Sequence, residues 1–219
     1  MTALMTPEEI TRLFTREDGS YAFARWGRPI APIVFGVRDE TLATVKGAVE
    51  AVATLAGHQM AETDPELGAN LMFFFFRDWE ELLDVPDLDQ MIPNLSYLVT
   101  RLAGEGASQY RAFRFDDAGG IQAAFVFLRM QGGMAKVPAE TLALTQAVQV
   151  MLMWGQQAFS EASPLAVLPD SGNTILRPQV AGVIAAAYDR MMPVASDDAS
   201  HALRLFARLQ ALPASEVAV

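Results

Sequence analysis

A run of six large apolar residues, Leu71–Phe76, sets the strongest limit on the fold. The run is too short to form a buried helix of its own, and it predicts a central β-strand that is buried on both faces. The segment RPIAPIVFGV, residues 28–37, predicts a second strand. Its two prolines place that strand at an edge of the sheet or delay its start, because proline has no N–H to donate to a neighbouring strand.

Two further β-rich segments, QYRAFRFDD and GIQAAFVFLRM, are separated by a turn at residues 116–120. They predict a β-hairpin over Gln109–Met130, with one face of the hairpin on the core and the other in solvent. Most other segments carry helical spacing or helix start signals. The predicted helices are Thr6–Phe14, Asp39–Gly57, a short helix from Asp78, Leu88–Ala103, Pro138–Phe159, Pro178–Met191 and Asp197–Leu212, the last with Ser196 as its N-cap.

This order of elements predicts an α+β fold in which a mixed, partly antiparallel sheet packs against helices, with a helical C-terminal third. The length of 219 residues favours one domain over residues 1–219. Within it we expect a sheet-rich part at about 25–130 and a helical part at about 137–212. A dinucleotide-binding fold is not expected, because no GxGxxG motif follows any predicted strand.

Hydropathy and the N-terminal segment bear on the compartment. No run of about 18 uncharged apolar residues occurs, so no membrane span is predicted. The N-terminal segment has glutamates close to its start and no apolar h-region, which argues against a secretory signal. We therefore expect a cytoplasmic protein, or a periplasmic one if the sequence begins at a mature N-terminus. The oligomeric state is left open.

Charge and cysteine content exclude several classes of function. Twenty-six acidic and sixteen basic residues give a net charge of −10, so phosphate backbones would be repelled and no nucleic-acid partner is expected. The complete absence of cysteine excludes disulfides, Cys-ligated zinc, iron–sulfur clusters and thiol catalysis. No cofactor is predicted.

Histidine is too scarce for the common catalytic sites. His58 and His201 are the only two, and a His/His/carboxylate metal site would require them to converge from distant parts of the chain. Serine catalysis is not expected, because the chain has no GxSxG motif and few candidate bases. The acidic pairs of the chain stand in turns or at helix starts, where capping explains them. No catalytic residue and no metal ligand is therefore predicted.

The second half of the chain resembles a known family in its order of elements. The hairpin leads into the predicted helix Pro138–Phe159, then a loop with Asp170 and Asn173, then a helix that opens at Pro178. That last helix closes as AAAYDRMMP, which is similar to the family motif LYDPRLKPGM at Tyr188, Asp189, Arg190 and Pro193. The family is a bacterial one of uncharacterised, often secreted proteins related to zincin metallopeptidases. The resemblance implies a zincin-like scaffold over about residues 25–210.

The predicted helix Pro138–Phe159 departs from that family where the metal site would be. A zincin needs two histidines four residues apart on one helical face, with a glutamate between them. This helix has no histidine, and its one glutamate, Glu140, lies in the first turn, where the helix dipole favours it. At the polar positions the helix offers Thr145, Gln146 and Gln149, and an amide is a poor zinc ligand. The resemblance thus implies a scaffold without zinc.

Our leading hypothesis is a non-catalytic, zincin-like domain that binds a protein or peptide partner in a cleft between this helix and the sheet. A methionine-rich patch with Trp154 is suited to an adaptable groove, although such residues more often fill a core; its methionines are Met151, Met153, Met191 and Met192. The segment 160–176, with two prolines and the sequence DSGN, is a long loop of the kind that carries function. The candidate partner-binding residues are Gln146, Gln149, Trp154, Asp170, Asn173 and Arg177.

Two other classes of function stay open at the level of sequence. The first is an enzyme of unrecognised type, in which carboxylates and Arg25, Arg28 or Arg177 act on a small polar or acidic ligand. A deep cleft with convergent carboxylates and arginines would favour it. The second is a structural or assembly protein, which a large two-fold apolar interface would favour.

Overall fold

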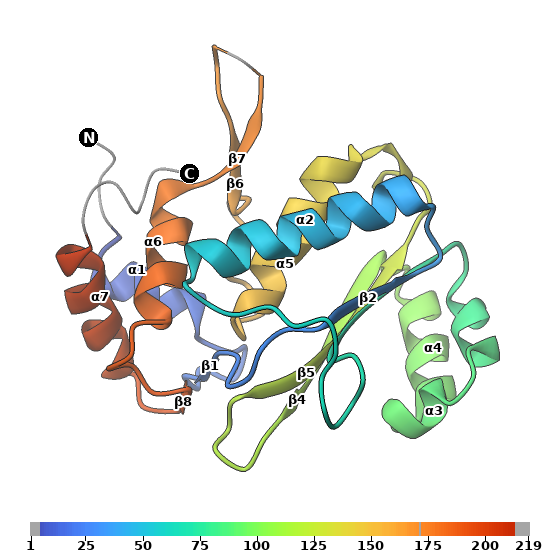
Figure 1. Ribbon diagram of the computed structural model, residues 1–219, viewed down its shortest axis with the longest axis horizontal. Helices are drawn as coiled ribbons and strands as arrows, with labels where there is room; N and C mark the ends of the chain where they lie inside the picture. Colours follow the sequence, from blue (N-terminus) through green and yellow to red (C-terminus); the bar gives the residue numbers. More distant parts are fainter. Residues whose placement is uncertain (1–4, 171, 213–219) are drawn as a thin grey trace.

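The computed structural model describes residues 5–170 and 172–212 of the chain (Figure 1). Its elements are α1 (Pro7–Leu13), β1 (Phe23–Ala24), β2 (Pro32–Phe35), α2 (Asp39–Leu55), β3 (Leu71–Phe76), η1 (Trp79–Asp84), α3 (Leu88–Met91), α4 (Leu95–Gly104), β4 (Gln109–Phe115), β5 (Ile121–Arg129), η2 (Met134–Lys136), α5 (Ala139–Met151), β6 (Leu165–Val167), β7 (Thr174–Leu176), α6 (Pro178–Ala187), β8 (Ala195–Ser196) and α7 (His201–Ala211).

The main sheet has four strands in the order β2-β3-β5-β4. Strands β2, β3 and β5 are parallel, and β4 pairs antiparallel with β5 at the free edge. The apolar run Leu71–Phe76 therefore forms a central strand, and β2 with its prolines lies at the opposite edge, as predicted. The fold is accordingly a mixed α and β arrangement with a partly antiparallel sheet.

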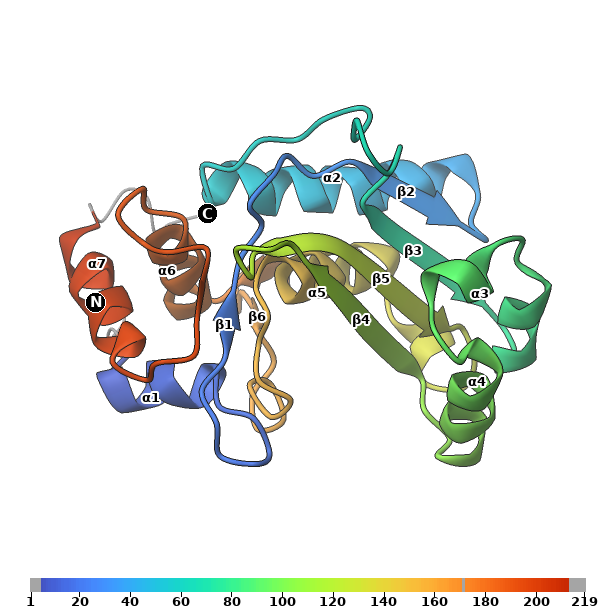
Figure 2. The ribbon, with the colours of Figure 1, turned by 90° about the horizontal axis from the view of Figure 1, so that it is seen from below.

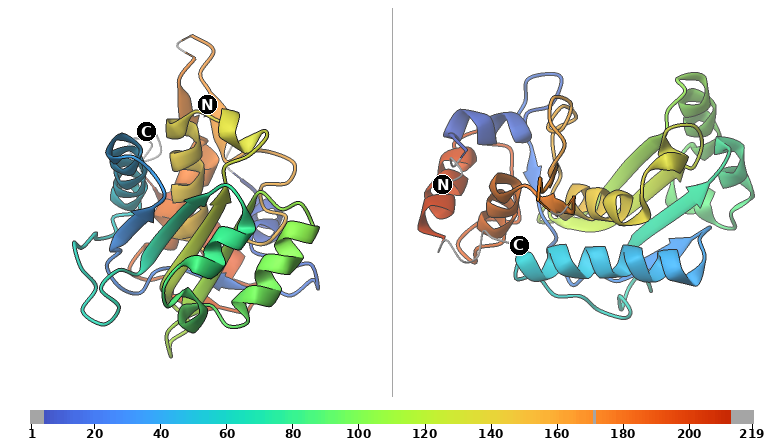
Figure 3. Two further views of the ribbon diagram at one scale, coloured as in Figure 1. Left: turned by 90° about the vertical axis from the view of Figure 1, so that its right-hand side faces the viewer. Right: turned by 90° about the horizontal axis from the view of Figure 1, so that it is seen from above.

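Helices cover both faces of this sheet (Figure 3). On one face α2 and α5 pack side by side over the strand residues Leu71, Phe73 and Val126. On the other face η1, α3 and α4 pack over Met72 and Phe74. We predicted that one face of the hairpin lies in solvent, and this prediction is wrong for β5. Every residue of that strand is buried except Gln122 and Arg129 near its ends. Each face of the sheet thus has its own apolar cluster, which fits strands of large apolar residues that point alternately to the two faces.

The molecule has the shape of an arch when it is seen from below (Figure 2). Helix α4 forms one side of the arch, and α1 lies on the other. Strand β4 lies between them as the outermost strand of the sheet. This arrangement leaves the free edge of β4 on the concave side of the molecule.

The predicted helix Pro138–Phe159 is shorter than expected, because α5 ends at Met151. Leu152 is extended and forms a bridge with Arg25, and the N–H of Met153 donates to the Ala24 carbonyl at 2.9 Å. Side chains bind the last helical carbonyls: the Trp26 indole donates to Val150 at 2.8 Å and the Tyr188 hydroxyl donates to Met151 at 2.7 Å. These long-range partners replace the hydrogen bonds that a further helical turn would make.

Other helix boundaries also differ from the prediction. The segment 88–103 is divided into α3 and α4 at Pro93, which cannot continue a helix, and Asn94 has a positive φ of 56°. The last helix begins at His201 with Ser200 as N-cap, because Ala195–Ser196 instead pairs with β1. Helix α6 ends at Ala187 rather than Met191.

The expected loop 160–176 contains the antiparallel hairpin β6–β7, which stands out from the body in Figure 1. Ser171 in this segment lies outside the described residues. The C-terminal third is therefore a mixture of helices and short strands, in place of a wholly helical part. None of the helices in the described ranges is both long and apolar enough to cross a membrane.

Candidate functional site

The two histidines lie in separate environments. His58 follows α2, and its Nε2 is 2.9 Å from the carbonyl oxygen of Arg28. His201 begins α7, and its Nδ1 is 2.8 Å from the Tyr21 hydroxyl in a buried contact. Within residues 5–170 and 172–212, no three histidine, aspartate or glutamate side chains gather in a way that could hold a metal ion.

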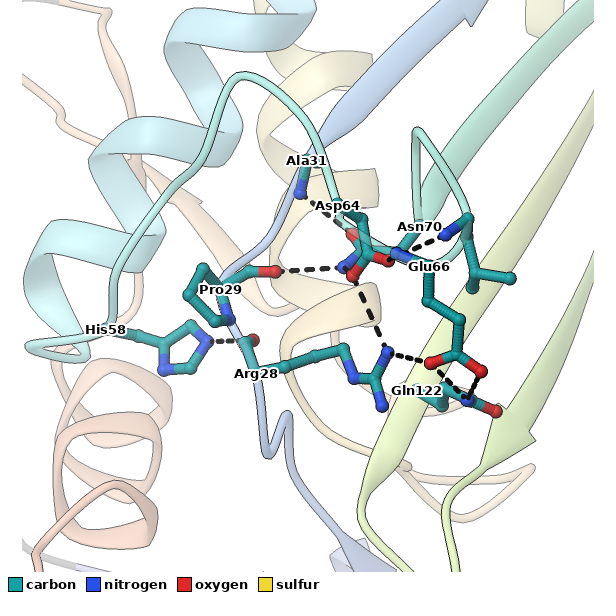
Figure 4. Close-up of polar contacts among 9 residues, drawn as sticks. Arg28, Pro29, Ala31, His58, Asp64, Glu66, Asn70 and Gln122 are labelled. Carbon is teal, nitrogen blue, oxygen red and sulfur yellow. Dashed lines mark hydrogen bonds and ion pairs between the residues drawn. The ribbon is translucent and has the colours of Figure 1, made fainter.

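Arg28, one of the arginines considered for an enzyme site, belongs to a polar network that fastens the segment between α2 and β3 (Figure 4). Its Nη1 lies 2.8 Å from Glu66 and 3.6 Å from Asp64. The buried Asn70 side chain donates to Asp64 at 3.0 Å and accepts from the Ala31 N–H at 2.8 Å. The charge of Arg28 is thus already balanced within this network.

Arg25 and Arg177 also serve the fold. Arg25 donates to the Met192 carbonyl at 3.1 Å and lies over the Tyr188 ring, with 5.4 Å between its Cζ and the ring centroid. Arg177 precedes α6, and its Nε donates to the Ser163 carbonyl at 2.7 Å. These contacts connect distant segments, and they do not bring the two arginines together with carboxylates around a cleft.

The most chemically distinctive cleft lies between β4 and α5, and we call it the α5-side cleft. It has a volume of about 540 Å³. Strand β4 contributes one wall, and Gln149 of α5 with the segment after α5 contributes the other. The lining residues are Gln109, Tyr110, Arg111, Phe113, Gln149, Met153, Trp154, Gly155, Gln156, Phe159 and Ser160.

Arg111 is the central polar group of the α5-side cleft. Its Nη1 donates to the Gln146 side-chain oxygen at 3.0 Å and to that of Gln109 at 3.3 Å. The Gln146 amide in turn donates to Gln109 at 3.0 Å. In the described part of the chain no carboxylate pairs with Arg111, and burial lowers the pKa of its guanidinium to about 10. The cleft therefore holds a cation whose partners are neutral amides.

Aromatic rings form the apolar wall of the same cleft. Trp154 stacks on Phe14 with ring centroids 5.3 Å apart, and Phe159 meets it edge-on at 5.0 Å. The Trp154 indole donates to the Val148 carbonyl at 2.9 Å. Because the indole is held by packing on one side and by a hydrogen bond at its nitrogen, this wall is preformed.

The free edge of β4 presents backbone groups to the same space. The Ser108 carbonyl accepts from the Arg129 N–H at 2.8 Å, and antiparallel pairs alternate between hydrogen-bonded and non-hydrogen-bonded positions. From the register, Tyr110 and Ala112 share the hydrogen bonding of Ser108, whereas Gln109, Arg111 and Phe113 turn their N–H and C=O groups away from β5. Within the described residues these outward groups have no hydrogen-bond partner.

The structure brings together three of the six residues proposed from the sequence. Gln149 and Trp154 line the α5-side cleft, and Gln146 holds Arg111 there. Asp170 and Asn173 lie on the β6–β7 hairpin, and Arg177 lies just before α6, away from the lining of this cleft. Of the methionines, Met153 lines the cleft, Met151 and Met192 are buried in the core, and Met191 is exposed.

Sequence reasoning missed Arg111 and Gln109. Their signal is the alternation of Gln109, Arg111 and Phe113 along a predicted strand, which places the three side chains on one face. That face becomes recognisable as a site only when α5 is known to lie beneath it.

No family model matches this chain, and neither a curated protein nor a solved structure matches it. Its function therefore has to be inferred from the shape, the charge and the unpaired groups of the α5-side cleft and of the β4 edge.

Proposed function

We propose that this protein is a non-catalytic, zincin-like domain that binds an extended polypeptide segment of a partner protein along β4. The observation that carries the proposal is the open edge of β4. There the outward backbone groups of Gln109, Arg111 and Phe113 have no hydrogen-bond partner among the described residues. An extended segment that adds to a sheet edge gains affinity from backbone hydrogen bonds. Edges without such a role are usually covered or interrupted.

Hollows on both sides of the strand support this mode of binding. The second, which we call the α4-side hollow, has a volume of about 480 Å³ and lies between β4 and the region from Met91 to Arg101. Gln109 and Arg111 line the α5-side cleft, whereas Ala112 and Arg114 line the α4-side hollow. Successive side chains of an added strand point to opposite faces of a sheet, so they would enter the two hollows in turn.

The charge around β4 favours an acidic segment as the occupant. Arg101, Arg111 and Arg114 line the two hollows, and no aspartate or glutamate stands among the described lining residues. Arg101 forms a long ion pair with Glu105, with 3.9 Å between Nε of the arginine and Oε1 of the glutamate. In a chain with a net charge of −10, this local excess of arginine would attract and orient an acidic partner.

Helix α5 and the elements around it are the basis for proposing a zincin-like scaffold without catalysis. The order of hairpin, α5 and α6 with the ending Tyr188–Pro193 supports a zincin-like scaffold. At the cleft α5 offers the amides of Gln146 and Gln149. An amide neither transfers a proton at neutral pH nor binds zinc well, so a binding role suits this helix better than a metallopeptidase role.

The strand-addition mode predicts a period of two in the peptide ligand. A displayed library of random seven-residue peptides would be selected on the full chain, and the best binder would be synthesised with one backbone N-methyl group at each position in turn. Methylation of alternate amides that face β4 is expected to weaken binding by roughly tenfold or more, because each removes a hydrogen bond and adds a clash. The intervening amides should tolerate it within about threefold. The measurement is fluorescence anisotropy.

Two results would contradict the proposed function. One is a pattern of sensitivity with helical spacing, or with no period. The other is a dimer of the chain in sedimentation experiments that the peptide disperses, since the β4 edge would then be occupied by a second copy of the same chain.

A further inference from the structure

We infer that the segment bound along β4 places a carboxylate on Arg111 and offers an N–H to Gln149, an inference that rests on the proposed function. It is carried by unpaired polar atoms of two side chains that line the same cleft, one on β4 and one on α5.

The Arg111 guanidinium is only partly used. It has five N–H donors in a planar fork, and the contacts to Gln146 and Gln109 both come from Nη1. Within residues 5–170 and 172–212, Nε and Nη2 have no acceptor. These two nitrogens lie on one edge of the guanidinium, and their N–H groups match the two oxygens of a carboxylate.

Among the described residues, Gln149 has an unpaired hydrogen-bond acceptor, whereas Arg111 has unpaired donors. Its side-chain oxygen Oε1 is buried and has no hydrogen-bond donor in the described chain. Gln149 lies one helical turn after Gln146, which holds Arg111, and it lines the same cleft as Arg111. Buried polar atoms without partners are rare in folded proteins, and an N–H of a ligand in this cleft would satisfy this one. A peptide can supply both the anion and the N–H.

A carboxylate fits better than a phosphate group. Arg111 is the one cationic side chain among the described residues that line the α5-side cleft, so a doubly charged phosphate would remain half neutralised. A carboxylate carries a single charge and pairs with one guanidinium in a bidentate manner. The carboxylate could belong to the C-terminus of the segment or to an aspartate or glutamate side chain, and matched peptides separate these two sources.

The test uses matched variants of the protein and matched peptides. Two libraries of seven-residue peptides would be selected on the full chain, one with free C-termini and one with blocked C-termini. In the best binder, each carboxylate in turn would be replaced by the carboxamide, and dissociation constants would be measured for the wild type, Arg111→Gln and Arg12→Gln. Arg12→Gln is the control, because it removes the same charge from an exposed position on α1 that lines neither hollow.

The expected result is a coupling between one carboxylate and Arg111. Arg111→Gln should weaken binding by roughly tenfold to a hundredfold, and Arg12→Gln by no more than about threefold. Replacement of one particular carboxylate should weaken binding to the wild type to a similar extent while changing little for Arg111→Gln. A sensitive C-terminal position identifies a terminal carboxylate, and a sensitive side chain identifies an acidic residue.

The inference is overturned if no carboxamide replacement weakens binding to the wild type, or if Arg111→Gln keeps the full sensitivity to it. A melting temperature of Arg111→Gln at or above that of the wild type would show that lost binding is not lost folding. If the N-methyl pattern has a period of two but the coupling is absent, strand addition stands and the carboxylate fails. If the period of two is absent, the proposed function itself fails.

Discussion

Replacing Gly36 with alanine is expected to destabilise the protein by about 3–5 kcal/mol, more than any other single substitution that we predict. Gly36 follows β2 directly and has φ +80°, a conformation that favours glycine. A Cβ at this position would overlap the backbone carbonyl oxygen of Phe75 in the neighbouring strand β3. Backbone cannot rotate away as a side chain can, so β2 or β3 would have to shift.

The matched control for this substitution is Gly19→Ala. Gly19 has a similar φ of +83°, but no atom lies within 4 Å of the Cβ that alanine would add. Its cost should be the left-handed strain alone, about 1–2 kcal/mol. Urea unfolding of both variants measures the difference. Equal losses in Gly36→Ala and Gly19→Ala would show that the approach of Gly36 to Phe75 is not tight.

Lowering the pH from about 7 to about 5 is expected to cost about 2 kcal/mol of stability through His201. Burial lowers the pKa of this imidazole from 6.5 to about 4, and Arg204 adds to the effect, while Asp198 opposes it. Nδ1 is held by the Tyr21 hydroxyl, and Nε2 is buried without a partner in the described chain. A protonated ring would therefore hold a charged N–H with no acceptor.

The sign of the effect follows from where the proton binds. Between pH 6.5 and about 4 the unfolded chain binds a proton at His201 that the folded chain does not, so the free energy of unfolding falls as the pH falls through this window. His201→Gln should remove most of the loss, since an amide does not titrate there. His58→Gln is the comparison, because burial also lowers the pKa of His58 while its Nε2 retains a backbone partner.

Urea unfolding at about pH 7 and about pH 5 would measure the loss for each protein, and most carboxylates stay ionised over this range. An undiminished loss in His201→Gln would assign the acid sensitivity to other groups.

Local composition predicts much of the fold. The side chains of the apolar run Leu71–Phe76 can be buried on both faces only in the middle of a covered sheet. The helix from Asp39 is indicated by apolar residues at helical spacing. The turn at residues 116–120 likewise predicts the β4–β5 hairpin. In these segments the preferences of the chain and the tertiary packing agree, which is why sequence reasoning succeeds there.

The end of α5 shows where such reasoning stops. The residues from Leu152 to Phe159 have helical composition, yet Trp26 and Tyr188 bind the last carbonyls of α5 and the chain turns into an extended segment beside β1. These partners are 124 and 37 residues away from the carbonyls they bind. No local pattern reports such contacts, so the local sequence assigns Trp154 to a helix that it does not join.

Residue types and short spacings are enough to establish the class of fold, the central strand, the hairpin and the scarcity of histidine. Long-range packing alone establishes that β4 is a free edge, that α5 lies beneath it, and that Arg111 meets Gln146 with no counter-ion among the described residues. Strand order and desolvation depend on which distant segments pack together. The electrostatic state of Arg111 is therefore a property of the assembled fold and not of its local sequence.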